Sequence, residues 1–290
     1  MEGDDVAYLE AAATVDERAH SAAGDAAFRA ALADAGGDGG VRVLEAGAGT
    51  CGVLRRLLAA DALPAGEWVA VDTDERVLSA GRHRLAAAAR AAGRGVETEG
   101  STTTLRSPDG GALRVRFRIA DVRTVAAEGP FDGVVARSFA DLLAPDDVLA
   151  LLRTAAPDGW YHLPLTFDGA TRFAPSHPVD DGVVDAFHGT MRERGRAATL
   201  LAGRFAEAGT PPAVDERADW VVEGDGDGGY PADEATFLRT VLDTVVASVR
   251  ESGAVADATL ADWAETREDQ LDRGALGYVA ENRDLFGRVP

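Results

Sequence analysis

Short apolar segments that alternate with helical stretches constrain this chain more than any other feature. The segments predict strands at residues 41–45, 68–71, 133–136 and 160–165, with helices between them at about 51–60, 73–92 and 145–156. This alternation is typical of a parallel sheet that carries helices on both faces. Residues 95–119 alternate in polarity instead, which predicts a hairpin that leads into a further strand. We therefore expect an α/β fold with a doubly wound, mostly parallel sheet.

The segments on either side of residues 41–165 do not show this regular alternation of strands and helices. Residues 1–40 predict helix that ends in a glycine-rich stretch. Beyond residue 165 the expected order is a polar and aromatic segment at 166–180, a helix at 181–208, a strand at 218–222, helices at 232–251 and 258–272, and a strand at 276–279. We expect residues 1–40 to form an N-terminal helical cap and residues 41–166 a ligand-binding core. Residues 167–290 would be the C-terminal part of the same domain, with cap helices and closing strands.

The charge is unusual. The chain carries 49 acidic residues against 29 basic ones, a net charge of −20, and every cation is an arginine. Such a surface suits a cytoplasm at high salt, where screening weakens self-repulsion, so we expect a halophilic, archaeal, cytoplasmic protein. The acidity argues against nucleic-acid binding, which depends on neutralising phosphates. The N-terminus has no signal-peptide pattern, no membrane span is expected, and the single cysteine, Cys51, excludes an internal disulfide.

A glycine-rich turn follows the first predicted strand. Gly47, Gly49 and Gly52 satisfy G-x-G-x-x-G between a strand and a helix, and Asp72 follows 20 residues later at the end of the next strand. A carboxylate there can accept hydrogen bonds from ribose hydroxyls. Glu45, two residues before the turn, would repel a pyrophosphate and suits a positively charged ligand without phosphate. S-adenosyl-L-methionine is such a ligand, and an NAD(P)-dependent oxidoreductase is the alternative that this carboxylate disfavours.

The run Glu45-Ala-Gly47-Ala-Gly49-Thr resembles the E/D-x-G-x-G motif of class I S-adenosylmethionine-dependent methyltransferases, with Cys51 where many members have a third glycine. The resemblance implies a Rossmann-like, seven-stranded sheet and S-adenosyl-L-methionine as cofactor. It places the ribose at Asp72, the adenine amine at Asp121 and the methionine end near Arg137. The cofactor-binding residues that it implies are Glu45, Gly47, Ala48, Gly49, Asp72, Thr73, Ala120, Asp121, Val122, Arg137 and Ser138.

Ligands of such sheets bind at the carboxyl ends of the strands, so the segments that leave these ends would surround a methyl acceptor. We expect the helices near the C-terminus to roof this pocket and the N-terminal helix to close one side, which favours a small-molecule methyl acceptor. A catalytically silent protein that binds the cofactor or a partner remains an alternative, because no base is evident. Nucleic-acid and membrane partners are not expected.

Histidine is the side chain best matched to proton transfer near neutral pH. His177 and His188 lie in the segment that leaves the fifth strand and are the candidate catalytic residues. His162 lies within that strand and could equally be structural. The spacing of Asp168, Asp180, His177 and His188 matches no metal-ligand pattern, so no metal site is expected.

Overall fold

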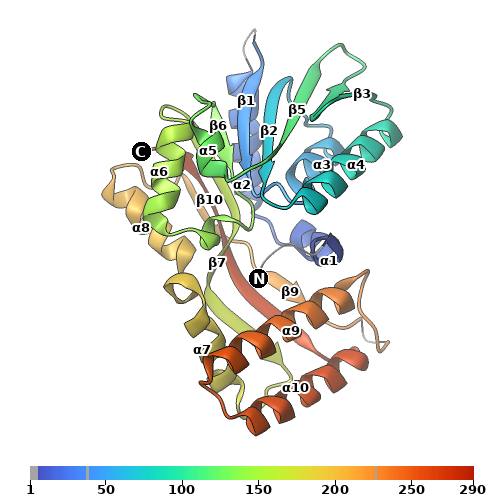
Figure 1. Cartoon of the computed structure of the whole chain (residues 1–290), viewed down its shortest axis with the longest axis vertical. Coiled ribbons are helices and arrows are strands. Elements are labelled where there is room, and N and C mark those ends of the chain that lie inside the picture. Colours follow the sequence, from blue (N-terminus) through green and yellow to red (C-terminus); the bar gives the residue numbers. More distant parts are fainter. Residues whose placement is uncertain (1–5, 37–38, 226) are drawn as a thin grey trace.

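A single mixed sheet of ten strands runs through the computed structural model (Figure 1), which describes residues 6–36, 39–225 and 227–290. Its strand order is β3-β4-β5-β2-β1-β6-β7-β10-β8, with β9 also paired to β10. The strands are β1 (Val41–Ala46), β2 (Gly66–Asp72), β3 (Gly95–Glu99), β4 (Thr102–Arg106), β5 (Ala112–Ile119), β6 (Gly133–Val135), β7 (Trp160–Ala174), β8 (Val214–Arg217), β9 (Trp220–Val222) and β10 (Gly277–Arg288).

The five strands β5-β2-β1-β6-β7 are parallel, and the expected Rossmann-like α/β class is confirmed. The chain builds outward from β1 in both directions, so the order reverses between β1 and β6. The sheet has ten strands among the described residues and not seven, because the β3–β4 hairpin extends one edge and a further strand, β8, precedes the strand expected at 218–222, which forms β9.

Helices cover both faces of the sheet. Alternate side chains of β1 enter opposite cores: Leu44 packs with α5, α6 and α8, whereas Val43 packs with α2, α3 and α4. Because both faces are apolar, the central strands read as nearly continuous hydrophobic runs. The helices are α1 (Val6–Arg18), α2 (Ala22–Ala35), α3 (Gly52–Ala59), α4 (Glu75–Ala91), α5 (Val122–Ala126), α6 (Pro145–Ala155), α7 (Asp180–Thr190), α8 (Ala197–Glu207), α9 (Glu234–Ser252) and α10 (Asp257–Asp272).

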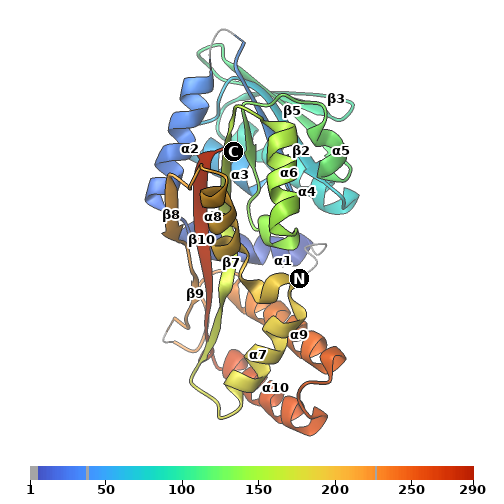
Figure 2. The same cartoon turned by 90° about the vertical axis from the view of Figure 1, so that its left-hand side faces the viewer.

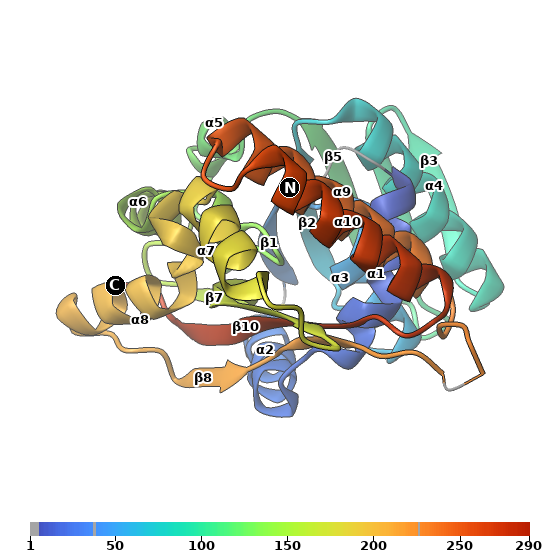
Figure 3. The same ribbon diagram turned by 90° about the horizontal axis from the view of Figure 1, so that it is seen from below.

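A third core lies beyond the carboxyl ends of the parallel strands. The strands β7 and β10 are long antiparallel partners that extend out of the sheet and carry α7, α9 and α10 (Figure 2). Helices α1, α7, α9 and α10 bury their apolar residues against this extension, with Phe237 and Trp263 fully enclosed. Viewed from below, α9 and α10 cross beneath the sheet beside α7 (Figure 3). The polar and aromatic segment expected at 166–180 is therefore largely strand, since β7 continues to Ala174.

Two helical predictions need correction. The expected helix at 181–208 is divided into α7 and α8 by a short 3₁₀ segment, η2 (Arg192–Gly195), where Gly195 has a φ of 72° and lies against the Phe167 ring. The 1–40 segment holds two helices, and α2 packs on the sheet while α1 joins the third core. None of the described helices is long and apolar enough to cross a membrane.

Candidate functional site

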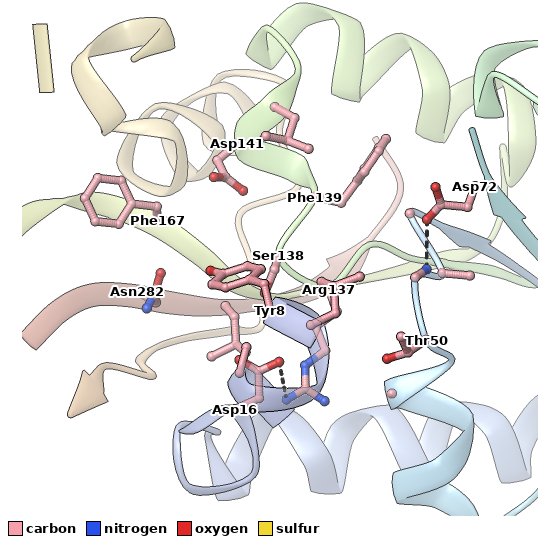
Figure 4. A pocket seen from close by; sticks show the side chains of 18 of the residues that line it. Tyr8, Asp16, Thr50, Asp72, Arg137, Ser138, Phe139, Asp141, Phe167 and Asn282 are labelled. Atoms are coloured by element: carbon pink, nitrogen blue, oxygen red, sulfur yellow. Dashed lines mark hydrogen bonds and ion pairs between the residues drawn. The ribbon is translucent and has the colours of Figure 1, made fainter. Parts of the chain in front are cut away.

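A cavity of about 2120 Å³ lies at the carboxyl ends of the parallel strands, beside the point where strand order reverses. The turns after β1, β2, β5 and β6 line one part of it, and α1, α7 and α9 enclose the rest. Its volume exceeds the roughly 300–1,000 Å³ of common small-molecule sites, so it has room for two ligands side by side. Figure 4 shows Asp72 and Thr50 at one end of this cavity and Phe167 and Asn282 at the other.

The glycine turn after β1 forms one wall. Gly47 has a φ of 64°, and a Cβ atom there would lie 2.4 Å from Cδ2 of Phe139, so only glycine fits between the turn and that ring. Gly49 has a φ of 52°, again in the left-handed region. Behind the turn, a Cβ on Gly81 of α4 would lie 2.8 Å from the Gly49 carbonyl oxygen. The glycines therefore let backbone approach a ligand on one side and α4 on the other.

Asp72 fixes this turn from the end of β2. Its Oδ2 accepts a hydrogen bond of 2.9 Å from the Gly49 amide, and its Oδ1 accepts one of 3.0 Å from the Asp74 amide. Each carboxylate oxygen has a second lone pair, and Asp72 lines the cavity. The carboxylate that holds the glycine turn is thus also free to accept hydrogen bonds from a ligand.

Glu45 lies at the bottom of the cavity near the end of β1. Its side chain is buried, and Oε2 accepts a 2.7 Å hydrogen bond from the Trp68 indole N–H. Burial raises the pKa of Glu45 to about 7, and the nearby Asp72 carboxylate adds to the rise, while Trp68 and Arg137 oppose it. A cation placed next to Glu45 would stabilise the ionised form of this buried carboxylate.

Arg137 supplies the opposite charge from the turn after β6. Its Nη2 lies 3.5 Å from Oδ2 of Asp16 in α1, while its Nε and Nη2 atoms are buried and have no hydrogen-bond partner among the described residues (Figure 4). Burial raises the pKa of Asp16, and the Arg137 guanidinium and the Trp220 indole oppose that rise. Buried donors without hydrogen-bond partners cost free energy, so a ligand anion that completed them would be favoured, in competition with Asp16.

The turn after β5 carries Ala120, Asp121 and Val122. Val122 is buried, with its side chain at the cavity wall. Asp121 caps α5 by accepting a 2.9 Å hydrogen bond from the Arg123 amide, and it also pairs with the Arg123 guanidinium, which holds the pKa of Asp121 below its ordinary value. A ligand amine at Asp121 would therefore share this carboxylate with Arg123.

The structure brings all eleven residues of the predicted cofactor set to this one cavity. Four separate turns contribute them, and each residue lines its wall: Glu45, Gly47, Ala48, Gly49, Asp72, Thr73, Ala120, Asp121, Val122, Arg137 and Ser138. The individual contacts that the sequence predicts for these residues stay predictions. Their convergence follows from the topology, since the carboxyl ends of parallel strands share one edge of the sheet.

The candidate histidines lie outside the cavity lining. His188 is buried behind it, where its Nε2 lies 3.0 Å from Oγ1 of Thr171, and burial lowers its pKa. His177 stands at the start of α7, and its backbone N–H donates a 2.7 Å hydrogen bond to Asp180. Neither imidazole lines the cavity, because β7 continues as a strand and places Thr171 at the wall instead. The catalytic role of the two histidines stays a prediction. His162 pairs with Asp284 in the core at 2.8 Å.

Sequence inspection missed the other end of the cavity, which we call the distal half and define by Tyr8, Asp141, Phe167, Tyr278 and Asn282. Tyr278 and Asn282 lie on one face of β10, as the period of two along a strand requires. Figure 4 shows Tyr8 between Asn282 and Arg137, with Asp141 above Tyr8 in this view. Helix α9 adds Val241, Thr244 and Ser248 at helical spacing, whereas α10 packs behind α9 and does not reach the cavity.

No group of three or more potential metal ligands occurs in the part of the chain that the structure describes. No protein-family model and no curated protein sequence matches the chain. Distantly similar solved structures include a mycolic acid cyclopropane synthase, CmaA1, complexed with SAH and CTAB (13% identity, TM-score 0.42, covering 92% of this chain and 83% of that one).

A putative sarcosine dimethylglycine methyltransferase from Galdieria sulphuraria is similar at 13% identity and a TM-score of 0.41, with 92% of this chain and 82% of that chain covered. The putative methyltransferase in a complex with the Haloferax volcanii Trm112 activator is similar at 16% identity and a TM-score of 0.42, covering 98% of this chain and 97% of that one. The likeness is one of fold. Because these sequence identities and TM-scores are low, we infer the function from the residues of this chain alone.

Proposed function

We propose that this protein is an S-adenosyl-L-methionine-dependent methyltransferase that acts on a small-molecule acceptor. The observation that carries the proposal is the pair of opposite charges that line the cavity at Glu45 and Arg137. Glu45 offers a buried carboxylate with a raised pKa. Arg137 offers a buried Nε–H without a hydrogen-bond partner, and its Nη2 is held only by the 3.5 Å ion pair with Asp16. An α-amino acid has one ammonium and one carboxylate, so the methionine end of the cofactor would satisfy both.

The rest of the glycine-loop side suits an adenosine. Asp72 holds free lone pairs toward the ribose position, and Val122 presents an apolar surface for a flat ring beside it. A dinucleotide would instead place its pyrophosphate against the glycine turn, close to the buried Glu45, where like charges repel in a partly dry cleft. The alternative of an NAD(P)-dependent oxidoreductase is therefore disfavoured by the position of Glu45.

Methyl transfer is an in-line displacement at carbon, so catalysis can come from proximity, orientation and exclusion of water. The cavity continues from Arg137 into the distal half without a break, and α1, β7, α7, α9 and β10 line it there. A recess walled by several elements supports a small acceptor over a polymer. In this assignment residues 41–166 bind the cofactor, and the cap helices with α1 enclose the acceptor. The acidic, lysine-free composition supports a halophilic, cytoplasmic setting in an archaeon.

Calorimetric titration in multimolar KCl with S-adenosylmethionine, S-adenosylhomocysteine and NAD tests the proposal. We expect both adenosyl compounds to bind and NAD to give no heat. Binding of NAD alone would favour the oxidoreductase. If folded protein gave no binding heat with any of the three compounds, the cofactor assignment would be wrong. Binding of the adenosyl compounds without consumption of S-adenosylmethionine, with a cell extract as the acceptor source, would favour the catalytically silent alternative.

A further inference from the structure

The distal half contains a carboxylate, Asp141, with one oxygen that has no hydrogen-bond partner among the described residues. Asp141 lies in the 3₁₀ segment η1 (Ala140–Leu142), just beyond the turn that carries Arg137, and it lines the cavity. Its Oδ1 atom is buried and has no hydrogen-bond partner among the described residues. Burial raises the pKa of Asp141 to about 6. The backbone N–H of Asp141 opposes this rise. A buried carboxylate oxygen without a hydrogen-bond partner is costly unless a ligand completes it.

Aromatic rings line the same half of the cavity as this carboxylate. Tyr8 of α1 lies below Asp141 in the view of Figure 4, and Phe167 and Tyr278 line this half from β7 and β10. Burial raises the pKa of the Tyr8 hydroxyl, to which Asp141 contributes, so that hydroxyl stays protonated near neutral pH. Aromatic faces attract cations through their quadrupole, most strongly where water is excluded.

Positive side chains are sparse here. Among the described residues that line the cavity near Asp141, Arg192 is exposed at the rim, and Arg137 faces Asp16 and Glu45. The other polar groups that line this part are neutral or acidic: Thr171, Thr244, Ser248, Asn282 and Glu251. A site with a carboxylate, aromatic walls and few cations is complementary to an ammonium group and repels a carboxylate or phosphate.

We propose that the methyl acceptor is an amine, bound as its ammonium form with one N–H directed at Asp141 and its carbon skeleton against Tyr8, Phe167 and Tyr278. This inference rests on the proposed methyltransferase function and names its substrate class. It also gives Asp141 the role of the base, in place of the predicted histidines.

The transfer balances with the groups at hand. The ammonium gives one proton to the Asp141 carboxylate, which leaves a neutral amine with a free lone pair. That pair attacks the methyl carbon of S-adenosylmethionine, the carbon–sulfur bond breaks, and its electrons remain on sulfur. The products are S-adenosylhomocysteine and a methylated ammonium, and the proton on Asp141 passes to solvent when the product leaves.

The test uses matched acceptors and a neutral, isosteric variant. Wild-type protein, Asp141→Asn and Asp147→Asn are each saturated with S-adenosylhomocysteine and titrated with sets of compounds that differ only in head group. Phenethyl, hexyl and indolylethyl skeletons are used, each as the primary amine, the alcohol and the carboxylate. Asp147 is an exposed aspartate at the start of α6, outside the cavity, and is the matched control.

We expect the amines to bind wild type and Asp147→Asn in preference to the alcohols and carboxylates, and at least about tenfold more weakly to Asp141→Asn, as loss of a charge-assisted hydrogen bond implies. With S-adenosylmethionine, methylated amines should form in the same order. Unchanged amine binding in Asp141→Asn, preference for an alcohol or carboxylate, or no amine bound by protein that binds S-adenosylhomocysteine would overturn the proposal. Failure of wild type to bind S-adenosylhomocysteine would instead count against the methyltransferase function itself.

Discussion

Replacing Glu45 with glutamine should stabilise the unliganded protein at alkaline pH while weakening its cofactor binding. The raised pKa means that the folded protein holds the Glu45 proton more tightly than the unfolded chain does. Protonated Glu45 therefore makes its full contribution to the free energy of unfolding below about pH 4.5. This contribution is lost as the pH rises through about 7. The difference between the ordinary and the raised pKa of Glu45 corresponds to about 3 kcal/mol in the free energy of unfolding. Glutamine keeps the acceptor oxygen for the Trp68 indole but carries no charge to bury.

Chemical denaturation of the wild type and Glu45→Gln at about pH 5 and about pH 8 measures this effect. The variant should exceed the wild type by up to about 3 kcal/mol at the higher pH and by much less at the lower one. Glu207→Gln, on the exposed face of α8, is the matched control and should show no such pH dependence. Equal differences at both pH values would refute the view that a costly buried charge is held at Glu45.

Three further predictions concern the site and the surface. Asp72→Ala removes the acceptor of the Gly49 and Asp74 amides as well as the ribose contact, so calorimetry should show cofactor affinity lower by at least about 1.5–3 kcal/mol, and an unchanged dissociation constant would contradict the ribose assignment. His188→Phe should cost about 1 kcal/mol of stability through loss of the Thr171 hydrogen bond but leave kcat intact, whereas a stable variant with little turnover would restore the catalytic role. Dialysis to low salt should remove secondary structure as the net charge of −20 becomes unscreened, and a circular-dichroism spectrum indifferent to salt would count against halophily.

The sequence predicts the glycine-loop half of the cavity well because its signals are local. Gly47 and Gly49 stand directly after a predicted strand, and Asp72 stands at the end of the next one. The parallel topology then brings these positions together without any information from distant contacts. Asp121 and Arg137 are implied by the family resemblance, and each lies within two residues of the end of its strand.

The distal half depends on contacts that a local pattern does not reveal. Tyr8 and Asn282 are 274 positions apart in the chain and meet only because β10 returns antiparallel to β7 and α1 packs over both. The prediction ended the fifth strand at residue 165, where Leu165 takes a φ of 56° yet the pairing with β10 resumes. That early end placed residues 166–180 in a loop, with His177 and His188 at the acceptor. Asp141 could not be predicted for a different reason. The chain has 31 aspartates, and nothing in the sequence shows that this one lines the cavity.

The central claim is that Glu45 and Arg137 hold the amino-acid end of S-adenosylmethionine. A calorimetric comparison of S-adenosylhomocysteine with 5′-methylthioadenosine, which keeps the adenosine and lacks the amino-acid group, tests it most directly. Loss of two charge-assisted contacts should weaken binding by roughly 3–6 kcal/mol before compensation, that is, at least about a hundredfold. Equal dissociation constants for the two compounds would show that the buried charge pair serves some other ligand.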